Sequence, residues 1–245
     1  MTLPTRLKTD LILDAAFEVR FTSKVETAEL LPGVVFPQLE DAGPVRRLPL
    51  ADFPAVARRA DPNLRGPLFK VTWGKHYVAV GDGLVTIGCE RPYPGWASFK
   101  PAIQQVCQLV AGFADKVERY SIKYVDMLPT RNAAESVEKL DVSLSIGGIA
   151  LSDQLYQLRL EVPAGELLNI VQVIGDATAV RETGEQFKGA VLDIDTLCNV
   201  RDDLSYGDFL ANLSQRSEEI HAANKTLFFS CLRKDTIEEL GPEYE

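Results

Sequence analysis

Apolar and polar residues alternate along two segments of the chain, one near its N-terminus and one near its middle. In the first, Phe17, Val19 and Phe21 alternate with Glu18 and Arg20. This period of two is typical of a half-buried strand and predicts one over 13–21. The second segment, 121–126, has the sequence Ser-Ile-Lys-Tyr-Val-Asp. It predicts a second strand with a similar polar face.

Further strands are predicted after each of these two segments. Residues 76–80 and 84–88 flank Gly81-Asp82-Gly83, which is turn chemistry, and predict a hairpin with a third strand at 69–73 beside it. In the second half, strand-like runs lie at 142–146, 155–162, 167–174 and 190–197. Because the connections within this run are short, antiparallel pairing is favoured over parallel pairing, which needs long crossovers.

Two long helices follow these strand runs, each with an apolar stripe at steps of three and four. The first is predicted to start near Trp96, with a stripe formed by Trp96, Phe99, Ile103, Val106, Val110 and Phe113. The second is predicted to start near Tyr206, capped by Ser205 or Asp203. Its apolar pattern continues to Leu232, so it is either longer than the first or broken near Asn224.

The order of strand, sheet segments and long helix thus occurs twice. The predicted fold is α+β, with pseudo-duplicated antiparallel β-sheet units, each followed by a long amphipathic helix packed on the sheet. The halves are predicted at 1–117 and 118–245, forming one compact structural unit. Residues 32–67 hold seven of the fourteen prolines and predict a wrapping arm with a short helical turn at 53–59. The tail, 235–245, is predicted to form a last helical turn and then to be disordered.

Composition and charge narrow the classes of function. The net charge of −9 argues against nucleic acid and anionic lipid as partners. The chain contains no run of 18 apolar residues, so no membrane span is predicted. The polar N-terminus does not resemble a secretory signal. The four cysteines are widely spaced, which predicts a cytoplasmic protein without disulfides or structural zinc. One segment, 43–80, is locally basic; it either packs against acidic surface or forms an anion-binding strip.

Several short motifs together carry a resemblance. They are Phe-Glu-Val-Arg-Phe at 17–21, Tyr-Pro-Gly-Trp-Ala-Ser-Phe at 93–99, the run 119–126, Leu-Asp-Ile-Asp at 192–195, and Ile220-His221. In order and spacing the chain resembles an uncharacterised, sporadically distributed bacterial family of hypothetical proteins. The resemblance implies a bacterial origin and this layout, and it implies no activity. Lys123 and Asp126 stand where the family usually has arginine and asparagine.

Motifs for common enzyme chemistry do not occur. The chain has no GxxxxGK[ST], no GxGxxG after a strand and no GxSxG, and its two histidines, His76 and His221, fit no metal-binding spacing. We therefore expect no cofactor, and the protein is more plausibly not an enzyme. The enzymatic alternative is a metal-dependent hydrolase or transferase that uses Asp193 and Asp195, whose carboxylates project from one face of a strand.

Charged residues on the two alternating strands form the candidate binding site. Glu18 and Arg20 share the polar face of the first strand, and the second segment supplies a comparable set: Arg119, Lys123, Tyr124 and Asp126. If the two strands are neighbours, these side chains form either register-fixing ion pairs or a binding site where the halves meet. The sequence thus favours a non-catalytic binding or regulatory protein that acts through a protein partner or a small ligand, with a homodimer as one possible assembly.

Overall fold

The computed structural model describes residues 3–143, 145–150, 152, 154–180, 184–201 and 203–244. The chain folds into two compact units, each assembled from separate stretches of sequence. Unit 1 comprises Met1–Leu13, Lys123–Thr196 and His221–Glu245, and unit 2 comprises Asp14–Ile122 and Leu197–Ile220. The predicted halves, 1–117 and 118–245, are continuous in sequence, whereas the compact units interleave along the chain.

Among the described residues, nine strands form one sheet, in the hydrogen-bonded order β10-β11-β12-β7-β2-β6-β5-β4-β3. The strands have these bounds: β1 Arg6–Leu7, β2 Ile12–Thr22, β3 Arg46–Arg47, β4 Pro67–Trp73, β5 His76–Gly81, β6 Leu84–Glu90, β7 Lys116–Pro129, β8 Ser145–Ile146, β9 Ile149–Ala150, β10 Gln157–Ala164, β11 Leu167–Val180, β12 Gln186–Asn199 and β13 Pro242–Glu243. The pairs β2–β6, β5–β6, β4–β5, β3–β4 and β10–β11 are all antiparallel. The predicted α+β class with an antiparallel sheet is therefore confirmed, while the duplication stays a prediction.

The α-helices have these bounds: α1 Thr27–Val35, α2 Ala55–Ala60, α3 Trp96–Val110, α4 Ala133–Lys139, α5 Tyr206–Ala211, α6 Leu213–Ser230 and α7 Lys234–Glu239. Short 3-10 turns occur at Phe36–Gln38, Pro49–Asp52 and Pro62–Leu64, each with a proline in its first turn. The arm 32–67 thus contains these short turns together with the end of α1, β3 and α2, which lies at the helical turn predicted for 53–59.

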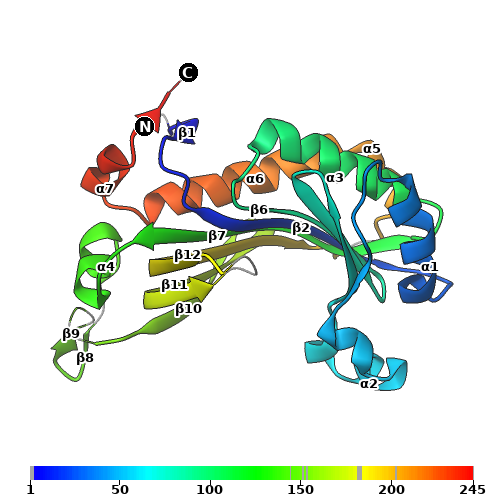
Figure 1. The fold of residues 1–245 in the computed structure, drawn as a ribbon, viewed down its shortest axis with the longest axis horizontal. Coiled ribbons are helices and arrows are strands. Elements are labelled where there is room, and N and C mark those ends of the chain that lie inside the picture. Colours follow the sequence, from blue (N-terminus) through cyan, green and yellow to red (C-terminus); the bar gives the residue numbers. More distant parts are fainter. Residues whose placement is uncertain are drawn as a thin grey trace. The chain divides into compact units, whose positions relative to one another are not determined.

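In unit 2, α3 lies along one face of the strands (Figure 1). The helix begins at Trp96 as predicted, and Phe99, Ile103 and Val106 of its stripe have no exposed surface. They share the core with strand residues such as Phe17, which is equally buried. Because alternate β2 residues enter this core, Asp14, Glu18 and Arg20 are left on the opposite face of the strand.

The second helical segment departs from the prediction. Ser205 caps α5, since its hydroxyl oxygen accepts a hydrogen bond from the Asp208 backbone N–H at 3.0 Å. The segment then breaks at Asn212, whose φ of −111° and ψ of 7° are not helical. Of the two alternatives, the longer helix is the correct one, since α6 has 18 residues against 15 in α3 and continues through Asn224. The Asn224 side chain donates to the carbonyl of Ile194 at 3.0 Å within unit 1. This polar residue therefore anchors the helix to β12.

Two further predictions need correction. The sequence prediction missed α1, because Pro32 lies inside the helix and was read as part of the arm. The tail is ordered beyond its predicted helical turn: after α7, β13 pairs with β1, Arg6 opposite Glu243. The strand predicted at 142–146 is limited to β8 at its C-terminal end, and Leu144 lies outside the described residues.

Candidate functional site

Glu18 is the centre of a charged cluster on the sheet face of unit 2, which we call the Glu18 cluster: Glu18, Arg20, Thr86 and Arg119. Its carboxylate accepts hydrogen bonds from Arg20 Nε at 2.7 Å and from Arg119 Nη2 at 2.9 Å. Thr86, its register partner on β6, donates a longer bond at 3.4 Å. The three charged side chains retain 17–25% of their exposure. They are therefore fixed in position but reachable from solvent.

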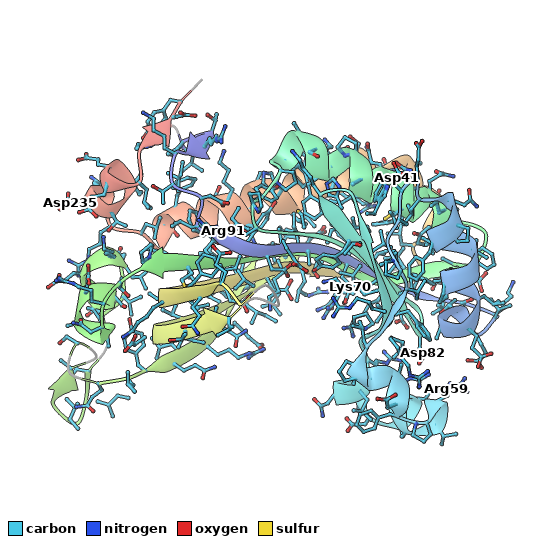
Figure 2. All side chains as sticks on the ribbon, in the orientation of Figure 1. Asp41, Arg59, Lys70, Asp82, Arg91 and Asp235 are labelled. Atoms are coloured by element: carbon cyan, nitrogen blue, oxygen red, sulfur yellow. The ribbon has the colours of Figure 1, made fainter. Side chains whose placement is uncertain are left out.

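A second pair of contacts continues the polar face across the neighbouring strands. The Tyr77 hydroxyl on β5 donates to the Asp14 carboxylate at 3.2 Å. Burial and the Asp14 charge raise the pKa of Tyr77 far above its usual value, so it stays a neutral donor. Lys70 on β4, labelled in Figure 2, pairs with Glu90 at 2.8 Å and lies 3.8 Å above the Tyr77 ring. The face is thus built from fixed ion pairs rather than loose surface charges.

A groove of about 380 Å³ opens in unit 2 next to the end of β2. Its walls come from Arg20 and the segment 21–27, from the arm through Arg59 and Arg65, and from the β5–β6 turn through Asp82. Figure 2 shows Arg59 and Asp82 on neighbouring elements of this region. Arg20 belongs both to the groove and to the Glu18 cluster.

The start of α1 fixes one wall of the groove. The buried Thr27 hydroxyl donates to the Gly81 carbonyl at 3.1 Å and accepts from the Gly83 N–H at 2.7 Å. Gly83 has a φ of +65°, and a Cβ there would lie 2.6 Å from the Phe21 carbonyl oxygen. Only glycine fits this turn, which holds the hairpin tip and α1 together.

The groove lining carries four basic side chains, Arg20, Lys24, Arg59 and Arg65, and three acidic ones, Glu26, Asp82 and Glu118. Two of the acids are already neutralised: Arg59 pairs with Glu26, and Arg58 pairs with Asp82 at 2.7 Å. Within the described chain, Arg65 makes no ion pair. By count the lining has one more basic than acidic side chain, although Arg20 and Lys24 are themselves paired, with Glu18 and with Asp115.

The other predicted binding residues belong to unit 1 and are distributed over different contacts. Lys123 pairs with Asp193 on β12 at 2.8 Å. Tyr124 contacts His221 of α6, with its hydroxyl 3.2 Å from Nδ1. Asp126 is buried, and burial followed by the charges of Asp10 and Asp193 raises its pKa to about 8. The structure brings Glu18, Arg20 and Arg119 together, while a single cluster that includes Lys123, Tyr124 and Asp126 stays a prediction.

Asp193 and Asp195, the enzymatic alternative, are both half-buried on β12. Asp193 is engaged by Lys123 and by Gln172, whose Nε2 donates at 3.4 Å. Nowhere in the described part of the chain do three or more His, Cys, Asp or Glu side chains gather as a metal site. The third ligand that a metal-dependent mechanism needs is therefore not found among these residues.

Sequence reasoning missed the groove as a site, although it identified its basic component. Much of the predicted basic segment 43–80 does pack against acidic side chains of the same chain, as Arg47–Asp52, Arg58–Asp82 and Lys70–Glu90 show. Arg65 differs from these by lining the groove. The signal available in the sequence was the excess of bases over acids in this segment, which leaves some bases unmatched.

Comparison of the chain with protein-family models and with curated proteins finds no match. Among the described helices, none is both long and apolar enough to cross a membrane.

Proposed function

We propose that this is a non-catalytic binding protein that takes a small anionic ligand, bearing phosphate or carboxylate, in the groove of unit 2. The observation that carries the proposal is that Arg20 belongs to both the Glu18 cluster and the groove. Its Nε is fixed by Glu18 at 2.7 Å, while the residue also lines the groove. A guanidinium held in this way loses little conformational entropy when it binds an anion.

The groove has the size and chemistry that such a ligand requires. Its volume of about 380 Å³ falls in the range of small-molecule sites, roughly 300–1,000 Å³. Arg65 and Arg59 approach from the arm, and the Ser23 hydroxyl is available from the other wall. Guanidinium groups bind phosphate and carboxylate in a bidentate manner, which favours planar or tetrahedral oxyanions over other ligands.

Three further features belong to the proposal. The two halves share one topology, since β2 is followed in the sheet by β6, β5 and β4, and β7 by β12, β11 and β10. This common order supports an internal duplication of one strand-and-helix unit. The four cysteines carry free thiols, which supports a cytoplasmic location. A regulatory role through a protein partner would use the same groove for an acidic peptide side chain.

Anion binding to the purified protein tests this function directly. We would titrate pyrophosphate and citrate by calorimetry at low salt into the wild-type protein and into an Arg65→Ser variant. Arg201→Ser is the matched control, because Arg201 is also exposed in unit 2 but does not line the groove. We expect Arg65→Ser to weaken binding about tenfold, the loss of one charge-assisted contact, and the control to bind like wild type.

A reciprocal variant sharpens this test. Glu118 is an exposed acid of the lining, and Glu118→Gln removes repulsion of the ligand, so we expect tighter binding. If neither anion binds wild-type protein, or if Arg65→Ser and Arg201→Ser have equal effects, the anion-binding function is wrong.

A further inference from the structure

Strand β10 of unit 1 is the last strand at one end of the sheet, and its neighbour there is β11. The strand at the other end of the order, β3, has two residues, both arginine, which is a common protection of a sheet edge. β10 is longer, with eight residues, and its charged residues Arg159 and Glu161 alternate with apolar ones. Leu160 and Val162 are 57% and 39% exposed. A long edge strand with exposed apolar residues is a template for pairing with another strand.

The apolar residues of β10 continue the core of unit 1 outward. Leu158, Leu160 and Val162 share one face of the strand, because side chains alternate. Leu158 packs against the hydrophobic cluster that contains Val171, Leu192 and other buried residues, whereas the next two members of the row are exposed. The core therefore runs to the edge of the sheet without an apolar cover at Leu160.

The turn after β10 determines which backbone groups face outward. Ala164 pairs with Leu167 across a two-residue loop that begins with Gly165 at a φ of +64°, the first position of a type II′ turn. Such a loop closes on a hydrogen-bonded pair, and hydrogen bonding then alternates along the strand. The N–H and C=O groups of Arg159 and Glu161 consequently point away from β11. Pro163 is also one of the residues whose backbone groups point away from β11. Since proline lacks an N–H, this is its usual place in an edge strand.

The sequence of β10 is complementary to itself. If two copies pair antiparallel with Leu160 opposite Leu160 of the partner subunit, Arg159 lies opposite Glu161 of the partner subunit. In this register the backbone groups of Arg159 and of Glu161 of the partner subunit are hydrogen-bonded to each other. This agrees with the outward direction of these groups in one chain. Within one chain these two side chains already pair at 2.7 Å while both remain half exposed. The same two charges can therefore exchange partners across the interface.

From these features we propose that β10 is the interface of a symmetric homodimer, in which two copies of this chain extend the sheet by antiparallel β10–β10 pairing centred on Leu160. The apolar row Leu158, Leu160 and Val162 forms one face of the contact. Two Arg159–Glu161 pairs form the other face and fix the register. The interface is independent of the groove in unit 2, so the two proposals can fail separately.

A charge-swap experiment tests the register. Glu161→Arg places arginine at both positions and Arg159→Glu places glutamate at both, so like charges face each other in either homodimer. We would measure molar mass by sedimentation equilibrium for each protein. We expect wild type to form a dimer of the 27.0 kDa chain, and each variant to dissociate, with a dissociation constant raised by about tenfold or more.

Mixing the two variants provides the control for folding. In the mixed pair, Arg159 and the new arginine at 161 face the two glutamates of the other variant, so we expect the dimer to return. Lys234→Glu, a charge reversal at an exposed position elsewhere in unit 1, should leave dimerisation intact. Monomeric wild-type protein at about 100 µM, a concentration at which even weak specific contacts form, would overturn the proposal. So would a dimer that neither variant weakens, or failure of two folded variants to dimerise when mixed.

Discussion

Glu18 of unit 2 and Asp126 of unit 1 are strand carboxyl groups with opposite electrostatic surroundings. Glu18 receives two guanidinium groups at 2.7 and 2.9 Å and keeps some exposure to solvent. Asp126 is buried, and the charges that act on it are those of two other carboxylates, Asp10 and Asp193. A charge is therefore stabilised at Glu18 and penalised at Asp126.

This difference separates two roles that look alike in sequence. Glu18 organises basic groups, of which Arg20 reaches the groove, so the cluster is suited to bind. Asp126 is neutral through much of the physiological pH range because its pKa is about 8. Because Asp126 is buried, its ionised form weakens the fold. Three substitutions of charged residues test this contrast. For each, the change in unfolding free energy is compared with that of a control substitution elsewhere in the chain.

The largest effect is expected for Asp126→Asn. In the unfolded chain Asp126 ionises near pH 4, whereas in the folded protein its pKa is about 8. Between these values the folded state binds more protons than the unfolded state, so stability falls as pH rises and the loss is complete above pH 8. The asparagine side chain of the variant cannot ionise, and we expect a gain of about 5 kcal/mol in unfolding free energy at pH 8.5 and almost none at pH 4.

Urea unfolding of wild type and Asp126→Asn across this pH range measures the effect. Asp141→Asn, at an exposed position of the same unit, serves as control and should show no such pH-dependent gain. Equal stability of the wild type and Asp126→Asn at pH 8.5 would contradict the assignment of a raised pKa to Asp126.

A smaller effect of opposite sign is expected for Glu18→Gln. The change leaves Arg20 and Arg119 partly buried without their carboxylate, and Arg119 Nε already lacks a partner among the described residues. We expect a loss of about 2 kcal/mol in unfolding free energy. Glu40→Gln, an exposed change in unit 2, should stay within about 0.5 kcal/mol of wild type. Equal effects of the two changes would show that the Glu18 cluster is ordinary surface.

The smallest effect is expected for Lys123→Gln. Lys123 is 38% exposed in its side chain, so solvent screens its pair with Asp193. We expect a loss below about 1 kcal/mol, and a smaller one at high salt. The looser pair of Lys188 with Asp176, at 3.5 Å, gives a control in Lys188→Gln that should cost less still. A loss for Lys123→Gln as large as that for Glu18→Gln would remove the distinction between the two units.

The sequence predicted strands and helices well wherever a single periodic face decided them. The strand at 13–21 and the helix at Trp96 each have one buried side, which fixes the period. The 76–88 hairpin is buried on both faces and was found from the turn residues between its strands. It failed where a contact distant in sequence decides the outcome. The tail was predicted to be disordered after its helical turn, but β13 is ordered there because it pairs with β1.

The part of the candidate site that depends on local periodicity was predictable, and the part that depends on distant contacts was not. Glu18, Arg20 and Arg119 were found because strand alternation places them on one polar face. The groove was not found, because its walls come from β2, the arm and the hairpin turn, and nothing local relates Arg65 to Arg20. The burial of Asp126 was equally invisible, since a charged residue type gives no sign that its neighbours will exclude water.

The interleaving of the two compact units has a consequence for synthesis on the ribosome. Unit 2 needs Leu197–Ile220 to complete a core begun at Asp14, and unit 1 needs His221–Glu245 to cover strands made much earlier. Neither unit can finish folding during translation until most of the chain has emerged. Until then the apolar residues of the early strands, such as Phe17, Val19 and Phe21, remain exposed. The topology therefore predicts that these apolar residues stay exposed for most of the time of synthesis.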